Sequence, residues 1–379
     1  MTETKQSVSV GFTGDVTFTQ YFGNDTERSG ILSPEISSFL AGTDHCVCNV
    51  EGPFTARKKT RESNFLHSSP PEAAVFLPEH GMDIWNLANN HMLDFGPGGL
   101  QDTLNRAASL NCSTIGAGEN ASDAAKPYLL DEAGGVGIIG ITYSASGSEA
   151  DPGGCCLRWN DHDRICEAIR LVKSQSRWCV LVIHGGEEFS SMPMQSTRDR
   201  YLHFLETGAD VIVGHHPHVV QNYEQVNGKL IFYSLGNFIF DTDYQRAQKN
   251  TEVGILLKLS FSAEKMTWDH LPVRINRTSK TLEVSDTPVI FTELSASDYN
   301  MLLPYAAKAL IRANRKRDAF LYPEKYRSYP RWKWSLRELY RCRNRQNRKL
   351  VMLSLRAGKR RMVDARLEQL RAYLYEGEG

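Results

Sequence analysis

Short apolar runs rich in Val and Ile alternate with segments of helical spacing through most of the chain. Apolar runs of this length that end in polar turns are typical of buried strands, and apolar residues three or four apart are typical of helices covering a sheet. The expected strands are 7–13, 45–50, 83–88, 136–142, 178–184, 210–214 and 230–234, and the expected helices are 98–110, 160–176 and 198–207. This alternation predicts an α/β fold in layers around a sheet.

The pattern changes beyond Leu235, where segments 253–262 and 267–275 predict a hairpin or two adjacent strands. We expect this first domain to occupy residues 1–295. No uninterrupted apolar stretch reaches about 18 residues, so no spanning helix is expected. The N-terminus lacks the charged and apolar segments of a signal peptide, which predicts a cytoplasmic location, with peripheral attachment to a membrane as the alternative.

Residues 296–379 form a second region with long helical spacing, over 297–317 and again over 335–375, separated by a break rich in Pro and aromatic residues. Residues 301–379 contain 21 Lys and Arg against 7 Asp and Glu, whereas residues 1–300 contain 23 against 37. This basic helical extension could pair with the acidic body. It could also bind an anionic membrane surface, an acidic polymer or capsule-synthesis proteins; nucleic acid is the least favoured partner.

The cysteines argue against a disulfide scaffold, because eight in 379 residues are too sparse. The Cys46-x-Cys48 and Cys155-Cys156 pairs have no second pair at the spacing of a zinc site. Six further histidines have no partners by spacing and are expected at the surface or in packed positions: His45, His67, His80, His162, His203 and His270.

Polar side chains follow five of the expected strands at the point where each strand ends. They are Asp15, then Asn49 and Glu51, then the segment Asn89 to Asp94, then His184 to Glu188, and last the cluster His215, His216 and His218. Ligands of layered α/β folds bind at the carboxyl ends of strands, so these groups are expected to converge. Carboxylate, amide and imidazole ligands without a thiolate suit Mn, Fe, Zn or Mg, in numbers sufficient for two ions. Two neighbouring ions that share a hydroxide are suited to hydrolysis.

The order of these motifs resembles the CapA family of bacterial capsule-synthesis proteins, itself similar to the calcineurin-like metallophosphoesterases. The motifs are Gly14-Asp15, Asn49-x-Glu51, Asn89-Asn90-His91-x-x-Asp94-x-Gly96, His184-x-Gly186-x-Glu188, Gly214-His215-His216-Pro217-His218 and Tyr233-Ser234-Leu235-Gly236-Asn237-Phe238. The resemblance runs from about residue 8 to residue 275 and does not include the basic extension. It implies a four-layer α/β/β/α sandwich of metallophosphoesterase type.

The resemblance also implies roles for individual residues and one or two divalent ions of Mn, Fe or Zn. Glu51 would bridge the ions, with Asp15 and His218 on one ion and Asn90, His184 and His216 on the other. His91 would protonate the leaving group, and Asp94, three residues later, would orient that imidazole. Glu188 and Asn237 would line the substrate side.

Two departures from the phosphoesterase pattern bear on the first ion. Asp15 is followed by Val16 and Thr17, without the usual His two residues on, and Glu51 replaces the usual Asp. His215 could supply the missing nitrogen, or one ion could bind weakly or not at all. CapA-like sequences share these departures, which favours that family over a general phosphatase.

The expected function is therefore that of a metal-dependent hydrolase-like protein in the biosynthesis of a capsule, exopolysaccharide or poly-gamma-glutamate-type polymer. Metal-bound hydroxide would attack a phosphodiester or amide of an anionic or saccharide polymer. Two alternatives are a non-catalytic capsule assembly factor and a nuclease or nucleotide phosphatase.

Overall fold

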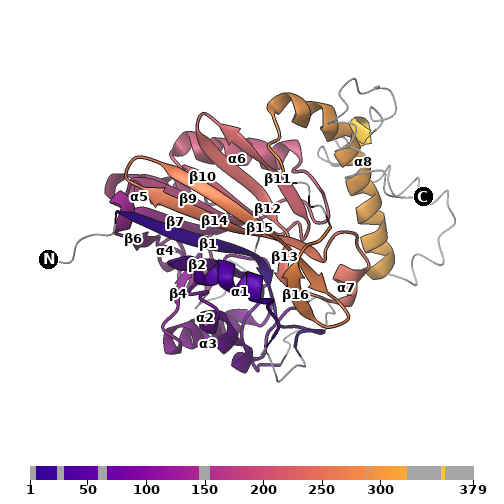
Figure 1. Cartoon of the computed structure of the whole chain (residues 1–379), viewed down its shortest axis with the longest axis horizontal. Helices are drawn as coiled ribbons and strands as arrows, with labels where there is room; N and C mark the ends of the chain where they lie inside the picture. The colour runs from indigo at the N-terminus through magenta and orange to yellow at the C-terminus, as the bar shows by residue number, and fades with distance from the viewer. Residues whose placement is uncertain are drawn as a thin grey trace.

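The computed structural model describes residues 6–23, 30–58, 66–144, 154–287, 289, 291–321 and 351–354. Within these residues two large sheets dominate the fold (Figure 1). The first contains, in spatial order, β16 (Thr281–Val284), β15 (Met266–Asn276), β14 (Val253–Ser262), β1 (Ser7–Val16), β2 (His45–Val50), β3 (Ile84–Asn86) and β4 (Ser113–Ile115), and β13 (Asn237–Ile239) also pairs with β1. The second contains β11 (Val220–Val226), β12 (Lys229–Leu235), β10 (Val211–His215), β9 (Trp178–His184), β7 (Val136–Thr142) and β6 (Tyr128–Leu130).

Helices and short elements complete the described fold. The α-helices are α1 (Pro34–Ala41), α2 (Phe76–Glu79), α3 (Gly96–Ser109), α4 (Ala121–Ala124), α5 (His162–Gln175), α6 (Gln195–Thr207), α7 (Asp243–Arg246) and α8 (Ala296–Leu321). Two 3₁₀ turns (Pro71–Val75 and Glu132–Gly134) and the short pair β5 (Ala117–Gly118) and β8 (Cys155–Cys156) join them. In the part of the chain that is described, no helix has both the length and the apolar character needed to cross a bilayer.

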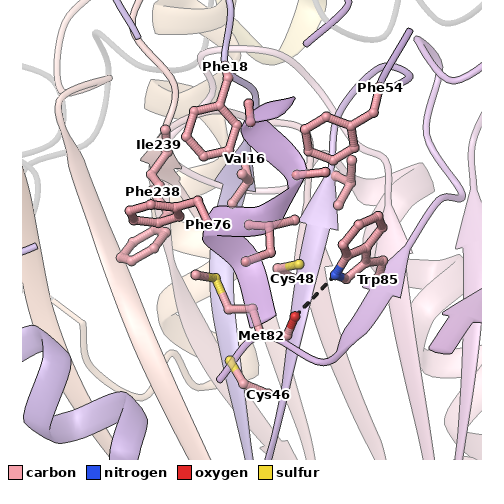
Figure 2. Packing of buried hydrophobic residues seen from close by; sticks show 14 of the residues in the cluster. Val16, Phe18, Cys46, Cys48, Phe54, Phe76, Met82, Trp85, Phe238 and Ile239 are labelled. Atoms are coloured by element: carbon pink, nitrogen blue, oxygen red, sulfur yellow. Dashed lines mark hydrogen bonds between the residues drawn. The ribbon is translucent and has the colours of Figure 1, made fainter. Parts of the chain in front are cut away.

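Three apolar cores hold the two sheets and their helices together. One core lies between the sheets and includes Phe12 of β1 and Phe232 of β12. A second lies on the other face of the first sheet, where α1, α2 and α3 pack, and a third joins the second sheet to α5 and α6. Figure 2 shows the second core, in which the indole nitrogen of Trp85 donates a hydrogen bond to the carbonyl of Met82 at 3.1 Å. The near-continuous apolar character of the central strands follows from burial on both faces.

The register of the parallel strands brings their carboxyl ends to one place. Asp15 of β1 lies opposite Asn49 of β2 on one side and Asn237 of β13 on the other, and His184 of β9 lies opposite His215 of β10. Glycine permits the close approach of backbones here: a Cβ atom at Gly14 would lie 2.4 Å from the carbonyl oxygen of Gly236. The side chains that follow these strands therefore start from fixed and neighbouring positions.

The structure confirms the mixed α/β fold, with strands at each range expected from the sequence. The predicted hairpin is β14 and β15, and α8 covers the range predicted as 297–317. The short strands β4, β6, β11, β13 and β16 were not expected, because three to seven residues of mixed polarity carry little periodic signal. The helix predicted over 335–375 lies outside the described residues except for a helical turn at 351–354.

Candidate metal centre

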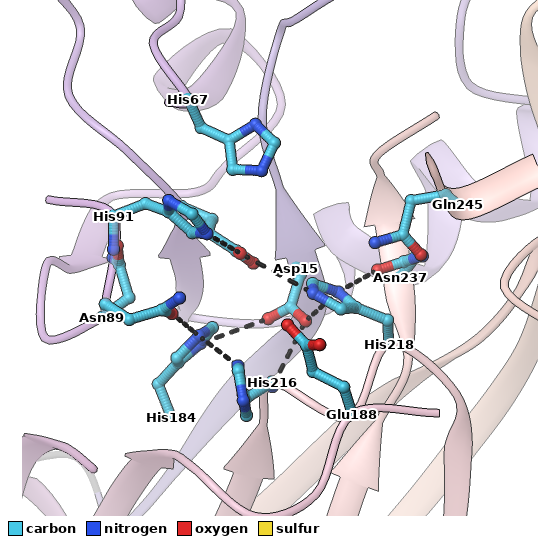
Figure 3. Close-up of polar contacts among 12 residues, drawn as sticks. Asp15, His67, Asn89, His91, His184, Glu188, His216, His218, Asn237 and Gln245 are labelled. Atoms are coloured by element: carbon cyan, nitrogen blue, oxygen red, sulfur yellow. Dashed lines mark hydrogen bonds and ion pairs between the residues drawn. The ribbon is translucent and has the colours of Figure 1, made fainter. Parts of the chain in front are cut away.

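The strand ends of both sheets converge on one buried cluster of carboxylate, amide and imidazole groups (Figure 3). The first sheet contributes Asp15 and Glu51 and the loop that follows β3, and the second contributes His184 and the loop that follows β10. The five sets of polar residues singled out in the sequence thus come together between the sheets.

Glu51 lies at the centre of this cluster and is fully buried. Its Oε1 is 3.7 Å from Nε2 of His218 and 3.8 Å from Nε2 of His91, beyond hydrogen-bonding distance in both cases. Neither carboxylate oxygen has a hydrogen-bond partner among the described residues. A buried carboxylate without donors is unfavourable unless a cation or a proton neutralises it.

Asp15 and His218 face Glu51 from the side of β13. Nδ1 of His218 lies 3.2 Å from Oδ2 of Asp15 and 3.0 Å from Oδ1 of Asn237. The amide nitrogen of Asn237 donates to the carbonyl of Thr251, so its oxygen is the atom that faces His218. This contact makes Nδ1 of His218 a donor and directs Nε2 toward Glu51.

A second set of ligand atoms surrounds Nε2 of His184. That nitrogen is 2.8 Å from Oδ1 of Asn90 and 3.2 Å from Nδ1 of His216. On the opposite side of the ring, Nδ1 of His184 lies 3.0 Å from Nδ2 of Asn49, which also donates to Oδ1 of Asp15 at 2.9 Å. Asn49 therefore joins the two sets of ligand atoms.

His91 lies at the accessible edge of the centre, with 16% of its side chain exposed. Its Nδ1 is 2.6 Å from Oδ2 of Asp94, which also accepts a hydrogen bond from the backbone nitrogen of His67 at 2.9 Å. The ring of His67 packs edge-on against His91, with their centroids 4.2 Å apart. The carboxylate of Asp94 thus orients His91 so that Nε2 faces Glu51.

Glu188 and two residues from distant elements form the opposite edge. The hydroxyl of Tyr244 donates to Oε2 of Glu188 at 3.0 Å, and Nη1 of Arg317, from α8, is 3.5 Å from the same oxygen. Glu188 also groups with His216 and His218 at distances suited to a shared ion. A residue of the basic extension therefore contacts the centre directly.

The backbone after β10 is strained where it carries two of the ligands. His216 has φ of 93° and His218 has φ of 58°, in the left-handed region that non-glycine residues seldom adopt. Such strain is concentrated at functional sites and persists only when the surroundings hold it. The strained turn directs both imidazoles inward.

Burial and neighbouring charges set the protonation of the cluster. Burial lowers the pKa of His184 well below its usual value and that of His216 to about 4, so both imidazoles are neutral. Burial raises the pKa of Glu51. For His218, burial acts downward, but the carboxylates of Glu51 and Asp15 outweigh it and raise the pKa to about 9. In the protein alone, therefore, a proton is held between His218 and the two carboxylates.

These residues fit a divalent metal centre. Glu51 has two buried oxygens without donors, Asp15 and His218 lie within reach of it, and the atoms around His184 are spaced as ligands of one ion are spaced. Oxygen and neutral imidazole nitrogen suit Mn, Fe or Zn. The six ligands predicted from the sequence all lie in this cluster, and their binding of ions stays a prediction: Asp15, Glu51, Asn90, His184, His216 and His218.

His215 uses one ring nitrogen in a contact between the sheets: its Nε2 donates to the carbonyl of Thr13 at 2.9 Å. Its Nδ1 is buried without a partner among the described residues, so its service as a ligand stays a prediction. His67, which shares a possible ion-binding group with Glu51 and His91, was not expected from its spacing in the sequence. No strand end precedes it, and only the fold brings it to the centre.

Asn237 is buried, and both atoms of its amide bond to protein groups. Its contact with substrate stays a prediction, while its position is that of a residue that orients His218. Glu188 is 21% exposed at the edge of the centre. Its role toward substrate also stays a prediction.

Comparison with known proteins places the chain among capsule-synthesis proteins. Residues 9–242 match the family model described as bacterial capsule synthesis protein PGA_cap. The PGA biosynthesis protein CapA of Bacillus subtilis (strain 168) is 32% identical over 258 residues, which are 66% of this chain and 68% of that protein. The capsule biosynthesis protein CapA of Bacillus anthracis is 28% identical over 264 residues, 65% of this chain and 63% of that protein.

Among solved structures, a hypothetical protein from Thermus thermophilus is similar at 15% identity and a TM-score of 0.41, covering 70% of this chain and 99% of that one. The family match and the two relatives confirm the resemblance drawn from the motifs. The chain belongs to the bacterial capsule synthesis protein PGA_cap family, of which the CapA proteins are members.

Proposed function

We propose that this protein is a metal-dependent hydrolase of metallophosphoesterase type, acting in the biosynthesis of a capsule or poly-gamma-glutamate-type polymer. The observation that carries the proposal is the buried carboxylate of Glu51, which has no protein donor among the described residues and lies between two sets of ligand atoms. The three apolar cores, one between the sheets and one on each outer face, support an α/β/β/α sandwich as its framework.

Asp15, Glu51 and His218 would hold one divalent ion, and Asn90, His184 and His216 would hold the other. Ions bound there would lower the pKa of a water and polarise a carbonyl or phosphoryl oxygen of the substrate. Asn49, Asn237 and Asp94 keep the imidazoles in fixed orientations, so little rearrangement is needed on binding.

His91 would supply the proton to the leaving group. Its side chain is 16% exposed, against 0% for His184 and 4% for His218, and its Nδ1 is held by Asp94 at 2.6 Å. That contact holds the Nδ1 proton, so the proton that the imidazolium form can transfer is the one on Nε2, which faces the centre. A positioned general acid of this kind contributes about 10²- to 10⁴-fold to the rate.

The substrate would be an anionic polymer with an amide or phosphodiester linkage. The names of the two relatives mention PGA and capsule biosynthesis, and Arg317 brings a positive charge to the edge of the centre. The basic residues beyond 321 would bind further along such a polymer, or attach the protein to an anionic membrane surface.

Two measurements on the full chain test the proposal. Metal content after Mn²⁺ loading is compared between the wild type and the double variant His184→Ala, His216→Ala, with His80→Ala as a control outside the centre. We expect the double variant to lose bound metal and the control to keep it; unchanged content in the double variant would overturn the ligand assignment.

Hydrolysis of a chromogenic phosphodiester and of a γ-glutamyl oligomer is then measured with Mn²⁺, Fe²⁺ or Zn²⁺. We expect turnover with one of these ions, reduced at least about 100-fold in His91→Asn. An intact metal centre without turnover on either substrate would favour a non-catalytic assembly role for the same fold.

A further inference from the structure

A second group of metal-ligating side chains lies outside the centre, on the outer helices α5 and α6 (Figure 1). His162 and Cys166 are four residues apart on α5, so they share one face of that helix. His203 projects from α6 toward them. The ligand atoms of the three residues lie within 4.8 Å of one another.

Two of the three distances between the ligand atoms match those of a tetrahedral zinc site. Nε2 of His162 is 3.3 Å from Nε2 of His203 and 3.6 Å from Sγ of Cys166. Zinc bound to nitrogen at about 2.0–2.1 Å and to sulfur at about 2.3 Å places two nitrogens about 3.3–3.4 Å apart and nitrogen and sulfur about 3.6 Å apart. A single ion could therefore reach all three atoms with little movement of the side chains.

The surroundings of the group also suit an ion. Cys166 is 5% exposed, while His162 and His203 are exposed, so the sulfur is shielded and the fourth position opens to solvent. Nδ1 of His203 is 3.8 Å from Oε2 of Glu206, one turn further along α6. That separation is beyond hydrogen-bonding distance, so Glu206 adds a negative charge beside the imidazole without orienting it.

We propose that His162, Cys166 and His203 form a second metal site, which binds one Zn²⁺ and joins α5 to α6. Its donors are two nitrogens and a thiolate, whereas the groups at the strand-end centre contain no cysteine among the described residues. The two sites therefore differ in chemical class, because a thiolate selects softer ions than carboxylates do. Zinc binding here is independent of whether the centre is catalytic.

Cobalt distinguishes the two sites by spectroscopy. The reduced, chelator-treated full chain is titrated with Co²⁺, and we expect a near-ultraviolet thiolate-to-cobalt charge-transfer band that saturates at one equivalent per chain. Co²⁺ at the strand-end centre gives no such band, because its proposed ligands include no thiolate. Addition of Zn²⁺ should displace the cobalt and abolish the band.

Two variants and a control decide the assignment. Cys166→Ser and His203→Ala should each lose the band, and Cys155→Ser, a half-buried cysteine outside the group, should keep it. His203 has a side chain that is 49% exposed, so its variant folds even if the substitution at the buried Cys166 does not. The proposal is overturned if the wild type shows no band, or if either variant retains it at full strength; the two histidines would then form a hydrogen-bonded contact only.

Discussion

At the scale of single residues, Glu51 is the least favourable side chain of the metal centre for the protein alone. Its carboxylate is buried between two sheets, and the described residues give it no donor. Other ligands are compensated: Asp15 by Asn49 and His218, and His184 by its amide neighbours. Glu51 is thus the residue at which a bound cation should change the stability of the protein most.

Glu51→Gln should make the metal-free protein more stable and should weaken metal binding. In excess chelator the variant should be more stable than the wild type, by about 1–3 kcal/mol, because a neutral amide replaces a buried carboxylate that has no hydrogen-bond donor among the described residues. In excess Mn²⁺ the wild type should gain stability and the variant should gain little. Thermal unfolding in both conditions measures this, with the exposed Glu72→Gln as the matched control; a wild type indifferent to chelator would contradict the prediction.

Asp94→Asn should impair proton transfer by His91 and leave metal binding unchanged. The carboxylate contacts His91 and lies outside the two ligand sets, so metal content should stay unchanged. The turnover number kcat on a chromogenic phosphodiester should fall by about 10²-fold or more, because His91 loses its orienting partner. Asp123→Asn removes a half-buried carboxylate that pairs with Lys126, outside the centre, and should leave kcat unchanged. Equal rates for the two variants would argue against His91 as the acid.

The buried imidazoles predict how the stability of the metal-free protein depends on pH. His184 and His216 have lowered pKa values in the folded chain, that of His216 about 4. Below about pH 6.5 these two imidazoles are therefore protonated in the unfolded chain and remain neutral in the folded chain. Stability should therefore fall as pH decreases from about 6.5 toward 4. His218, with a pKa of about 9, contributes stability that is present below pH 6.5 and lost as pH rises through 9.

Urea unfolding in chelator from about pH 4 to 10 checks this, and we expect the greatest stability near pH 6.5, with a decline on the acidic side and a decline from about 6.5 to 9 on the basic side. His216→Ala should flatten the acidic limb, while His80→Ala, at a half-buried position outside the centre, should not. Stability that keeps rising below about pH 6 would contradict the assignment of neutral imidazoles.

At the scale of elements, α8 links the basic extension to the centre. Tyr299, Leu302 and Ala306 in its first half pack against Met192 and Met194 of the loop before α6. Near its other end, Arg317 contacts Glu188, and the ring of Phe320 lies 5.6 Å from that of Tyr244. The first part of the extension therefore packs as an element of the body, on the side of the metal centre.

Arg317→Ala should weaken the binding of an anionic substrate more than it changes turnover. The half-exposed contact with Glu188 contributes at most about 1 kcal/mol to stability, so the fold should persist. KM for a chromogenic phosphodiester should rise several-fold, with a smaller change in kcat. Lys308→Ala, at an exposed position of the same helix, is the control for lost charge alone. An unchanged KM would exclude Arg317 from the substrate side.

At the scale of the whole molecule, the charges divide between an acidic body and a basic C-terminal region. Residues 1–300 contain 37 acidic against 23 basic side chains, and residues 301–379 contain 7 against 21. Opposite charges in one chain favour contact between its parts, while an external anionic surface competes for the basic part. Salt weakens both kinds of contact.

A flotation experiment tests whether the basic C-terminal region binds an anionic membrane in preference to the acidic body. The full chain should float with phosphatidylserine vesicles at low ionic strength and not with neutral vesicles. A truncation after Leu321 is the matched variant, because it keeps α8 on the body and removes the basic clusters beyond it. Equal flotation of both chains, or of neither, would contradict membrane binding through this region.

The sequence was sufficient for much of this structure because buried parallel strands are short continuous apolar runs, each followed by its polar ligands. Asp15, Glu51 and His184 could be placed for that reason. His67 and Arg317 could not, since each reaches the centre from an element with no strand-end signal. His162 and His203 also gave no signal, because the crossing of two helices, and not spacing along the chain, brings them together.

At His216 and His218, the residue that best suits the backbone conformation differs from the residue that metal binding would require. Both residues have a positive φ, which glycine and asparagine adopt more readily than histidine. In a library of random variants chosen only for folding, these two positions should drift toward Gly and Asn. In a second library selected for metal content, both positions should remain His. Comparing the two libraries would distinguish residues required for metal binding from residues required for folding.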